Sequence, residues 1–439
     1  MDTPICDFVR RYADSDTLRL HMPGHKGWGP LGVEHLDITE ISGADSLYEA
    51  EGIIAESEAS ASSLFGCPTF YSTEGSSHCI RAMMYLSVLY GKQVGRKPLI
   101  AAGRNAHKVL LSAAALLDVE IEWLYPKSGG TYLSCPISAE DLDAALGDMS
   151  EKPVAVYVTS PDYLGNMLDI KALADVAHRY GCLLMVDNAH GAYLKFLPKS
   201  LHPMDLGADL CCDSAHKTLP VLTGGAYLHT SPALSGFAKN ALALFGSTSP
   251  SYLILQSLDG ANAMLADSYP AKLAETISAV EKLKTKLTYT FLGSEPTKLT
   301  IDAKAYGYTG TALAERLRQK GIECEFADPD YLVLMVSPEI GTISLSRLAQ
   351  ALAAIHPQGP MDCTAPCLHI PARVMSIRDA VLSPSETISV EHSEGRILAS
   401  ATVGCPPAVP IIVCGEQIDK ATIERFRYYG IEHCCVVIE

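Results

Sequence analysis

An aspartate and a lysine, 30 positions apart, have the residue types and surroundings that covalent cofactor chemistry needs. Asp187 ends the apolar run CLLMVD, which has the composition of a buried parallel strand. Lys217 follows a second short strand-like run at 208–212 and comes just after Ser214 and His216. Because open α/β sheets bind ligands at the carboxyl ends of their strands, both side chains are expected at one sheet edge. A carboxylate for a pyridinium nitrogen and an amine for a Schiff base predict a site for pyridoxal phosphate.

Each of these residues also has an ordinary structural explanation. A carboxylate at the end of a strand often caps the next helix, and a single lysine carries little information. Their combination is more specific, because the small residues Ala189 and Gly191 would let a flat ring come close to Asp187. The lysine is also preceded by two hydrogen-bonding side chains.

A small-residue turn lies at another predicted strand end. The stretch 68–72 predicts a strand, and an apolar helix follows the turn and runs to about Tyr90. A strand, a tight turn and a helix start offer free backbone N–H groups to a phosphate, although the same pattern is also a common helix cap. The turn contains Thr73, Glu74, Gly75 and Ser76.

Two segments carry histidines that could serve such a site. His107 follows the apolar strand at 98–102, so it is expected at the same sheet edge, where an imidazole could stack on a pyridine ring. A structural histidine is the alternative. The Gly- and Pro-rich loop at 21–30 carries His21 and His25, and it could be a surface loop or line the active site of a partner subunit.

Strands and helices alternate along most of the chain, which predicts an α/β fold. We expect an irregular N-terminal segment at 1–50 and a major domain at 51–265 with a mostly parallel, doubly wound sheet. A smaller α+β region is expected at 266–439. Its last part, from about 370, contains the strand-like runs EGRILASATV and PIIVCGE.

Composition narrows the possible partners. A chain of 439 residues can form two or three cores, and 34 basic against 50 acidic residues give a net charge of −16. That charge argues against nucleic acid or an anionic membrane surface as a partner. The 14 cysteines include no paired CxxC motif with zinc spacing, so we expect no metal and mostly buried thiols in a cytoplasmic protein. No apolar run approaches the roughly 18 residues of a membrane helix.

A series of motifs runs along the chain: HMPGHKG, DITEISGADSLYEAEGII, RNAHK, SPDYLGNMLDI, VDNAHGAY, DSAHKTLPVLTGGAYLH, STSPSYLILQSLDG and EGRI followed by PP, P and CGE. Together these motifs resemble the Orn/Lys/Arg decarboxylase family over nearly the whole chain. The resemblance implies a fold type I pyridoxal-phosphate enzyme of the shorter bacterial form, a homodimer or larger assembly with active sites shared between subunits. It implies decarboxylation of arginine, lysine or ornithine to an amine and CO₂, as in polyamine biosynthesis.

The resemblance also implies roles for single residues. Lys217 would form the Schiff base, Asp187 would pair with the pyridinium nitrogen, and His107 would stack on the ring. Glu391 would hold the far end of a basic substrate, although it could equally be a solvated surface charge. The residues implied to contact the phosphate are Thr73 to Ser76, Ser214 and His216, with Thr248 reaching the phosphate of the neighbouring subunit.

The chain departs from the family pattern at three places. Asn188 stands where the family commonly has glutamate, and Glu74 stands where a serine or threonine usually faces the phosphate. A carboxylate beside a phosphate is costly unless it points away or is protonated. Cys405 and Ala408 replace the tyrosine and glycine expected around Pro406 and Pro407. Two alternatives therefore stay open: an aminotransferase or lyase on the same fold, and a cofactor-binding homologue without activity.

Overall fold

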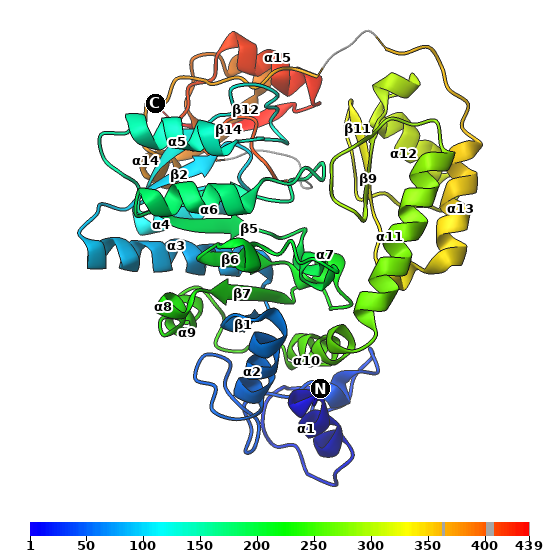
Figure 1. Cartoon of the computed structure of the whole chain (residues 1–439). Coiled ribbons are helices and arrows are strands. Elements are labelled where there is room, and N and C mark those ends of the chain that lie inside the picture. The colour runs from blue at the N-terminus through cyan, green and yellow to red at the C-terminus, as the bar shows by residue number, and fades with distance from the viewer. Residues whose placement is uncertain (362–364, 401–407, 439) are drawn as a thin grey trace. The chain divides into compact units, whose positions relative to one another are not determined.

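The computed structural model describes residues 1–361, 365–400 and 408–438 (Figure 1). The chain forms two compact units. Unit 1 consists of Met1–Leu86 and Leu184–Leu273, and unit 2 consists of Ser87–Leu183 and Ala274–Glu439.

The strands of unit 1 follow the order β1-β7-β6-β5. Strand β5 (Leu183–Asp187) runs parallel to β6 (Leu210–Asp213), and Asp187 is paired with Cys212. Strands β7 (Ala226–Thr230) and β1 (Thr69–Ser72) continue the sheet in antiparallel register. Every residue of β5 is buried, as expected of a strand covered on both faces. The parallel pair brings the carboxyl ends of β5 and β6 to one edge of the sheet. Asp187 ends β5 at this edge, and Lys217 follows the end of β6.

The helices of unit 1 include one that the sequence analysis missed. Residues 1–50 were expected to be irregular, but Pro4–Ala13 forms helix α1, so that expectation is wrong for this stretch. Ile5 and Val9 are buried, and the backbone N–H of Cys6 donates to Asp259 Oδ2 at 2.9 Å. The other helices are α2 (Ile53–Phe65), α3 (Gly75–Val94), α7 (Ala215–Thr218), α8 (Pro232–Ser235), α9 (Ala238–Ala243), α10 (Tyr252–Ala266) and α11 (Tyr269–Lys286). Helices α3 and α11 belong partly to unit 1 and partly to unit 2.

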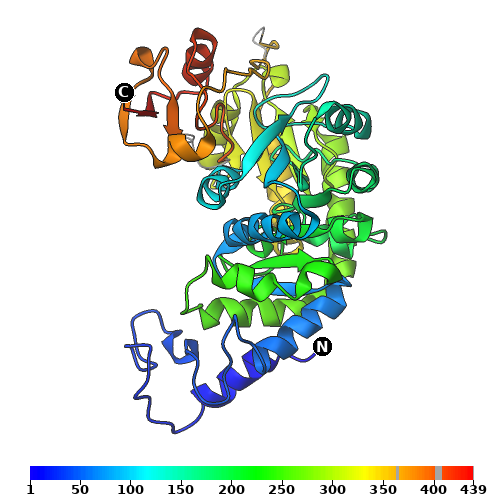
Figure 2. The ribbon, with the colours of Figure 1, turned by 90° about the vertical axis from the view of Figure 1, so that its left-hand side faces the viewer.

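Unit 2 contains three parallel strands in the order β4-β2-β3. They are β4 (Ala155–Thr159), β2 (Leu99–Gly103) and β3 (Glu120–Leu124). Helices α5 (Ala139–Asp148) and α6 (Ile170–Arg179) lie on one face of these strands, and α4 (Val109–Leu117) lies on the other (Figures 1 and 2). Helices on both faces of parallel strands are the predicted doubly wound arrangement.

Two smaller antiparallel sheets complete unit 2. The first has the order β10-β11-β9-β8 and packs with α12 (Gly310–Arg318) and α13 (Gly341–Ala353). The second has the order β12-β14-β13 and is accompanied by α14 (Ile377–Leu382) and α15 (Lys420–Tyr428). The strands are β8 (Phe291–Leu292), β9 (Lys298–Asp302), β10 (Phe326–Ala327), β11 (Tyr331–Met335), β12 (Ser385–Ser389), β13 (Leu398–Ser400) and β14 (His433–Val437).

One predicted strand near the C-terminus is not a strand. PIIVCGE at 410–416 is irregular, although Ile411 and Ile412 belong to the buried core of the C-terminal sheet. Gly415 has φ +87°, and a Cβ there would lie 2.3 Å from the carbonyl oxygen of Met375, so the chain turns at this glycine. The run EGRILASATV supplies β13, whereas residues 401–403 and the motif positions Cys405, Pro406 and Pro407 lie outside the described residues.

The twelve described cysteines are free thiols, and most are buried, as expected. In the part of the chain that the structure describes, no helix combines the length and the apolar character needed to cross a bilayer.

Candidate active site

Two hydrogen bonds join the segments that follow β1, β5 and β6. Ser214 Oγ donates to Ser76 Oγ at 2.7 Å, which ties the turn after β6 to the start of α3. Lys217 Nζ lies 3.1 Å from Nε2 of His190, three residues beyond the end of β5. The phosphate turn, the aspartate segment and the lysine segment predicted from sequence therefore meet in unit 1. His190 was not singled out in the sequence, although it lies in the quoted motif VDNAHGAY.

Asp187 ends β5 in a nearly closed environment. Its side chain is 3% exposed, and its Oδ1 accepts the backbone N–H of Ala189 at 3.2 Å. The Cys212 thiol on β6 lies 3.6 Å from the same oxygen. A carboxylate held this far from water interacts strongly with a nearby positive charge, because little solvent screens it. Its pairing with a pyridinium nitrogen stays a prediction.

A backbone hydrogen bond between two glycines joins the predicted phosphate turn to the segment that follows Lys217. The backbone N–H of Gly75 donates to the carbonyl of Gly224 at 2.7 Å, and His216 Nδ1 lies 3.0 Å from the carbonyl oxygen of Gly225. Burial lowers the pKa of His216, so we assign a neutral ring that donates through Nδ1–H. Thr73 is nearly buried in the same turn. The backbone N–H groups at the start of the 20-residue helix α3 form a site suited to an anion.

Two predicted site residues, His107 and Glu391, lie in unit 2. His107 is half-buried, and its Nδ1 accepts the backbone N–H of Val109 at 3.2 Å at the start of α4. Glu391 lies in the short 3₁₀ helix Val390–His392 and forms a two-pronged ion pair with Arg427, with Oε1 2.8 Å from Nε. Sequence reasoning missed Arg427, because the two residues are 36 positions apart.

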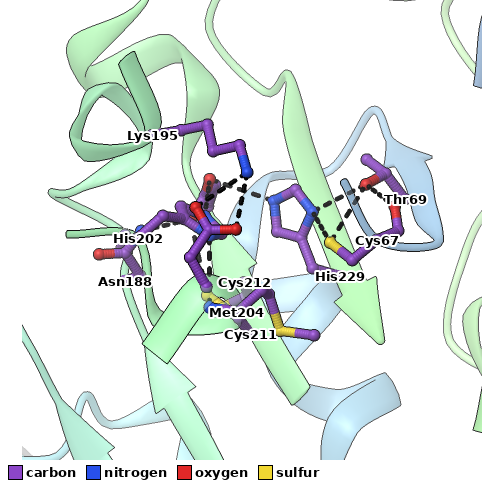
Figure 3. Close-up of polar contacts among 12 residues, drawn as sticks. Cys67, Thr69, Asn188, Lys195, His202, Met204, Cys211, Cys212 and His229 are labelled. Carbon is purple, nitrogen blue, oxygen red and sulfur yellow. Dashed lines mark hydrogen bonds and ion pairs between the residues drawn. The ribbon is translucent and has the colours of Figure 1, made fainter. Parts of the chain in front are cut away.

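A buried polar cluster precedes the lysine turn. Asp213, at the end of β6, is fully buried, and its Oδ2 lies 3.1 Å from Nε2 of both His202 and His229. Figure 3 shows the His229 ring reaching toward Thr69, whose Oγ1 is 2.9 Å from Nδ1. Burial alone would raise the pKa of Asp213, but the two imidazoles outweigh it and hold that pKa below the usual range. The cluster fixes the strand end directly before Ser214.

This chain matches one protein family over most of its length. The family described as Orn/Lys/Arg decarboxylase, major domain, matches residues 3–294, and the corresponding C-terminal domain matches residues 368–432. The chain belongs to the Orn/Lys/Arg decarboxylase family. It is a pyridoxal-phosphate-dependent amino-acid decarboxylase, as the resemblance implied.

Relatives and solved structures agree with this assignment. The decarboxylase is 29% identical to an arginine decarboxylase of Bacillus subtilis (strain 168), over 96% of this chain and 92% of that protein. It is 30% identical to an arginine decarboxylase of Halalkalibacterium halodurans, over 97% of this chain and 93% of that protein. A lysine decarboxylase structure from Francisella novicida covers 99% of this chain and 79% of its own, with a TM-score of 0.81 at 17% identity. The predicted fold class is confirmed.

The side chains of unit 1 fit the cofactor chemically. Ser76 and Ser214 place two hydroxyl groups at the start of α3, where a phosphate would be expected. Lys217 provides a primary amine on the neighbouring turn. Asp187 provides a nearly buried carboxylate of the kind that keeps a ring nitrogen protonated.

The structure gives a physical reason for Asn188 in the decarboxylase. Its side chain is fully buried, and Nδ2 donates to Asp213 Oδ1 at 2.7 Å. A glutamate at this position would bring a second carboxylate toward Asp213, and two like charges in a buried site repel strongly. The amide is a donor matched to the acid that it faces, and Asp187 keeps its own contacts.

Glu74 is turned toward the loop that carries Thr248. The side chain is exposed, and Oε1 accepts the backbone N–H of Ser247 at 2.7 Å. Thr248 is also exposed on this loop. The carboxylate is thus engaged by a backbone donor next to the threonine, which reduces the expected conflict with a phosphate in the turn.

Proposed function

We propose that this chain removes the α-carboxylate of L-arginine and releases CO₂ and the corresponding amine. The proposal rests on the two hydrogen bonds, Ser214 to Ser76 and Lys217 to His190, that join the three strand-end segments. Arginine is favoured over lysine and ornithine because full-length relatives at 28–30% identity are named arginine decarboxylases. Release of CO₂ and amine from each of the three amino acids tests the proposal.

Each chain residue in the site has a defined task. Pyridoxal phosphate, when bound, withdraws electrons from the α-carbon of the attached amino acid and so weakens the bond to its carboxylate. Asp187 would hold the proton on the ring nitrogen, because its burial leaves the attraction between the two charges largely unscreened. Lys217 would anchor the cofactor through Nζ. His190 Nε2, 3.1 Å from that nitrogen, is placed to exchange a proton with it.

A homodimer with shared active sites is part of the proposal. The segment after α1, an extended loop in Figure 2, exposes a series of large apolar side chains, and Trp28 is 88% exposed. A single exposed apolar side chain is ordinary, whereas several in one loop indicate a surface that another protein covers. A second copy of the chain is the partner that we propose for it. The other members of the series are Leu18, Leu20, Met22 and Leu31, which are 65–81% exposed.

Mixed dimers are expected to show whether Thr248 serves the neighbouring active site. Lys217→Ala and Thr248→Ala chains, each weakly active alone, should regain activity when they are mixed and allowed to exchange subunits. In such hybrids one of the two sites contains both native residues. Activity assays before and after exchange make the measurement. No gain over the separate variants would mean that each site is built from one chain.

Glu391 is proposed to bind the distal guanidinium of the substrate. Its carboxylate already holds the guanidinium of Arg427 through two contacts, the geometry that planar guanidinium groups prefer. A substrate guanidinium would have to replace Arg427. The two side chains are each 55% exposed, so such an exchange needs no buried charge to be left without a partner.

Paired substitutions separate this role from a surface ion pair. Glu391→Gln is expected to raise KM for arginine on the order of 10-fold, because one charge-assisted contact to the substrate is lost. Arg427→Gln is expected to lower KM, because it removes the competing guanidinium. Steady-state kinetics make the test, with Glu394→Gln as the control for an exposed acid in the same loop. A change below about twofold in both variants would place Glu391 outside the substrate site.

A further inference from the structure

A cavity of about 380 Å³ lies within unit 2, lined by residues other than the predicted site residues. Its walls come from the end of α15, the turn between β10 and β11, and the segment around Val409. The lining is mainly aromatic and aliphatic, with few charged groups. The side chains that matter for its chemistry are Tyr132, Phe326, Asp328, Tyr428 and Tyr429.

Three tyrosine rings form one side of the cavity. The ring centroids of Tyr132 and Tyr429 are 4.5 Å apart, and those of Tyr428 and Tyr429 are 4.9 Å apart and nearly perpendicular. The faces of such rings carry partial negative charge and attract cations. Lys304 Nζ already lies 4.8 Å from the centroid of Tyr428. The rings therefore suit a ligand with a positive charge and an apolar body.

Asp328 supplies a carboxylate to the same cavity. Its Oδ1 accepts the backbone N–H groups of Asp330 at 2.8 Å and Tyr331 at 2.7 Å, whereas its Oδ2 accepts a long bond of 3.4 Å from Tyr132. The side chain is 7% exposed. Burial, together with the nearby Asp330, raises the pKa of Asp328 to about 6. Oδ2 is the atom with the most remaining capacity to accept a hydrogen bond.

The charges around the cavity do not balance. Lys304 is paired with Asp330 at 2.6 Å, and Arg427 is paired with Glu391. Within residues 1–361, 365–400 and 408–438, no cation lies within ion-pair distance of Asp328. A buried carboxylate is stable as an anion only when a positive charge or several donors compensate it. Three hydrogen-bond donors compensate the Asp328 carboxylate in part, and a bound cation would complete the compensation.

We propose that this cavity binds a small organic cation, a primary amine or guanidinium with an apolar chain. The charged end pairs with Asp328, and the chain packs against the rings of Tyr132 and Tyr429. Amines released by the proposed decarboxylation have this chemistry, so the identity of the natural ligand, though not the site, rests on the proposed function. A lysine or arginine side chain of a second copy has it too, and the experiment separates these two sources.

Amine binding to the intact holoenzyme tests the site. The probe is agmatine, with 1-pentanol as a neutral apolar control, and calorimetry counts sites per chain. We expect one class of agmatine sites to persist in Lys217→Ala and to weaken on the order of 10- to 100-fold in Asp328→Asn. Glu323→Gln, an exposed acid on the same unit, is the matched control and should leave binding unchanged. Melting curves identify any variant that fails to fold, and Tyr429→Leu then replaces Asp328→Asn.

The outcomes separate this proposal from its rivals. Equal agmatine affinity and stoichiometry in wild type, Asp328→Asn and Tyr429→Leu would overturn it. If Asp328→Asn instead dissociates the oligomer in sedimentation runs while agmatine has no second site, a side chain of another copy is the occupant and a free amine is not. A chain that fails to turn over arginine but still loses agmatine binding in Asp328→Asn would contradict the proposed function alone.

Discussion

Replacement of Lys217 by alanine is expected to abolish the visible absorbance of bound cofactor and to lower the activity by more than about 10³-fold, while the chain stays folded. The side chain lies on the short helix α7 with Nζ at His190, where it is available as a covalent anchor. It is only partly buried, so its loss leaves no large cavity. Absorbance spectra, far-ultraviolet circular dichroism and turnover assays make the measurement.

Lys199→Ala is the matched control for this variant. Lys199 is an exposed lysine of the same unit, and its replacement should change neither spectrum nor rate. Full activity or unchanged absorbance in Lys217→Ala would show that Lys217 is not the cofactor anchor.

Replacement of Asp187 by asparagine is expected to preserve cofactor binding and to reduce kcat on the order of 10²- to 10³-fold. An amide is nearly isosteric and can still accept the N–H of Ala189, so the strand end should keep its shape. It carries no charge to keep the ring nitrogen protonated, and each unit of pKa lost there corresponds to about 1.4 kcal/mol, or tenfold. Spectra and single-turnover rates distinguish binding from chemistry.

Asp175→Asn provides the comparison for this second variant. Asp175 is exposed on α6 and paired with Lys171, so its replacement should leave the rate within about twofold. An unchanged rate in Asp187→Asn would reduce Asp187 to a cap for the N–H of Ala189.

Much of the fold could be predicted because its strands are continuous apolar runs. The run that ends at Asp187 forms β5, and the expected strand at 98–102 corresponds to β2. Such runs are apolar because parallel strands are buried on both faces, and that requirement is visible residue by residue. The antiparallel pairing of β1 and β7 leaves no comparable signal, since it depends on which strands meet in space.

The errors arose where distant contacts decide the local structure. Helix α1 is short and is stabilised by contacts with α10, for example Cys6 with Asp259, which lie 253 positions apart. The run PIIVCGE has the composition of a strand, but its apolar residues are buried as an irregular segment that turns at Gly415. Neither the contact between Cys6 and Asp259 nor the turn at Gly415 can be predicted from neighbouring residues in the sequence.

The candidate site shows the same limit. Sequence spacing pointed to Lys217, Asp187 and the turn at 73–76, because each follows a recognisable strand. It did not reveal His190, nor that Glu391 is held by Arg427, since both depend on side chains that meet only in the folded chain. The available signal for His190 was a histidine three residues after the strand that ends at Asp187.

The most direct test of the central claim is the product balance with the holoenzyme. Purified protein loaded with pyridoxal phosphate is incubated with L-arginine, L-lysine or L-ornithine, and CO₂, amine and α-keto acid are quantified together. We predict CO₂ and amine in equal amounts, no keto acid, and the highest kcat/KM with arginine. Keto acid without CO₂ would indicate an aminotransferase. Cofactor absorbance without turnover of any of the three amino acids would indicate an inactive homologue, and either result would contradict the proposed function.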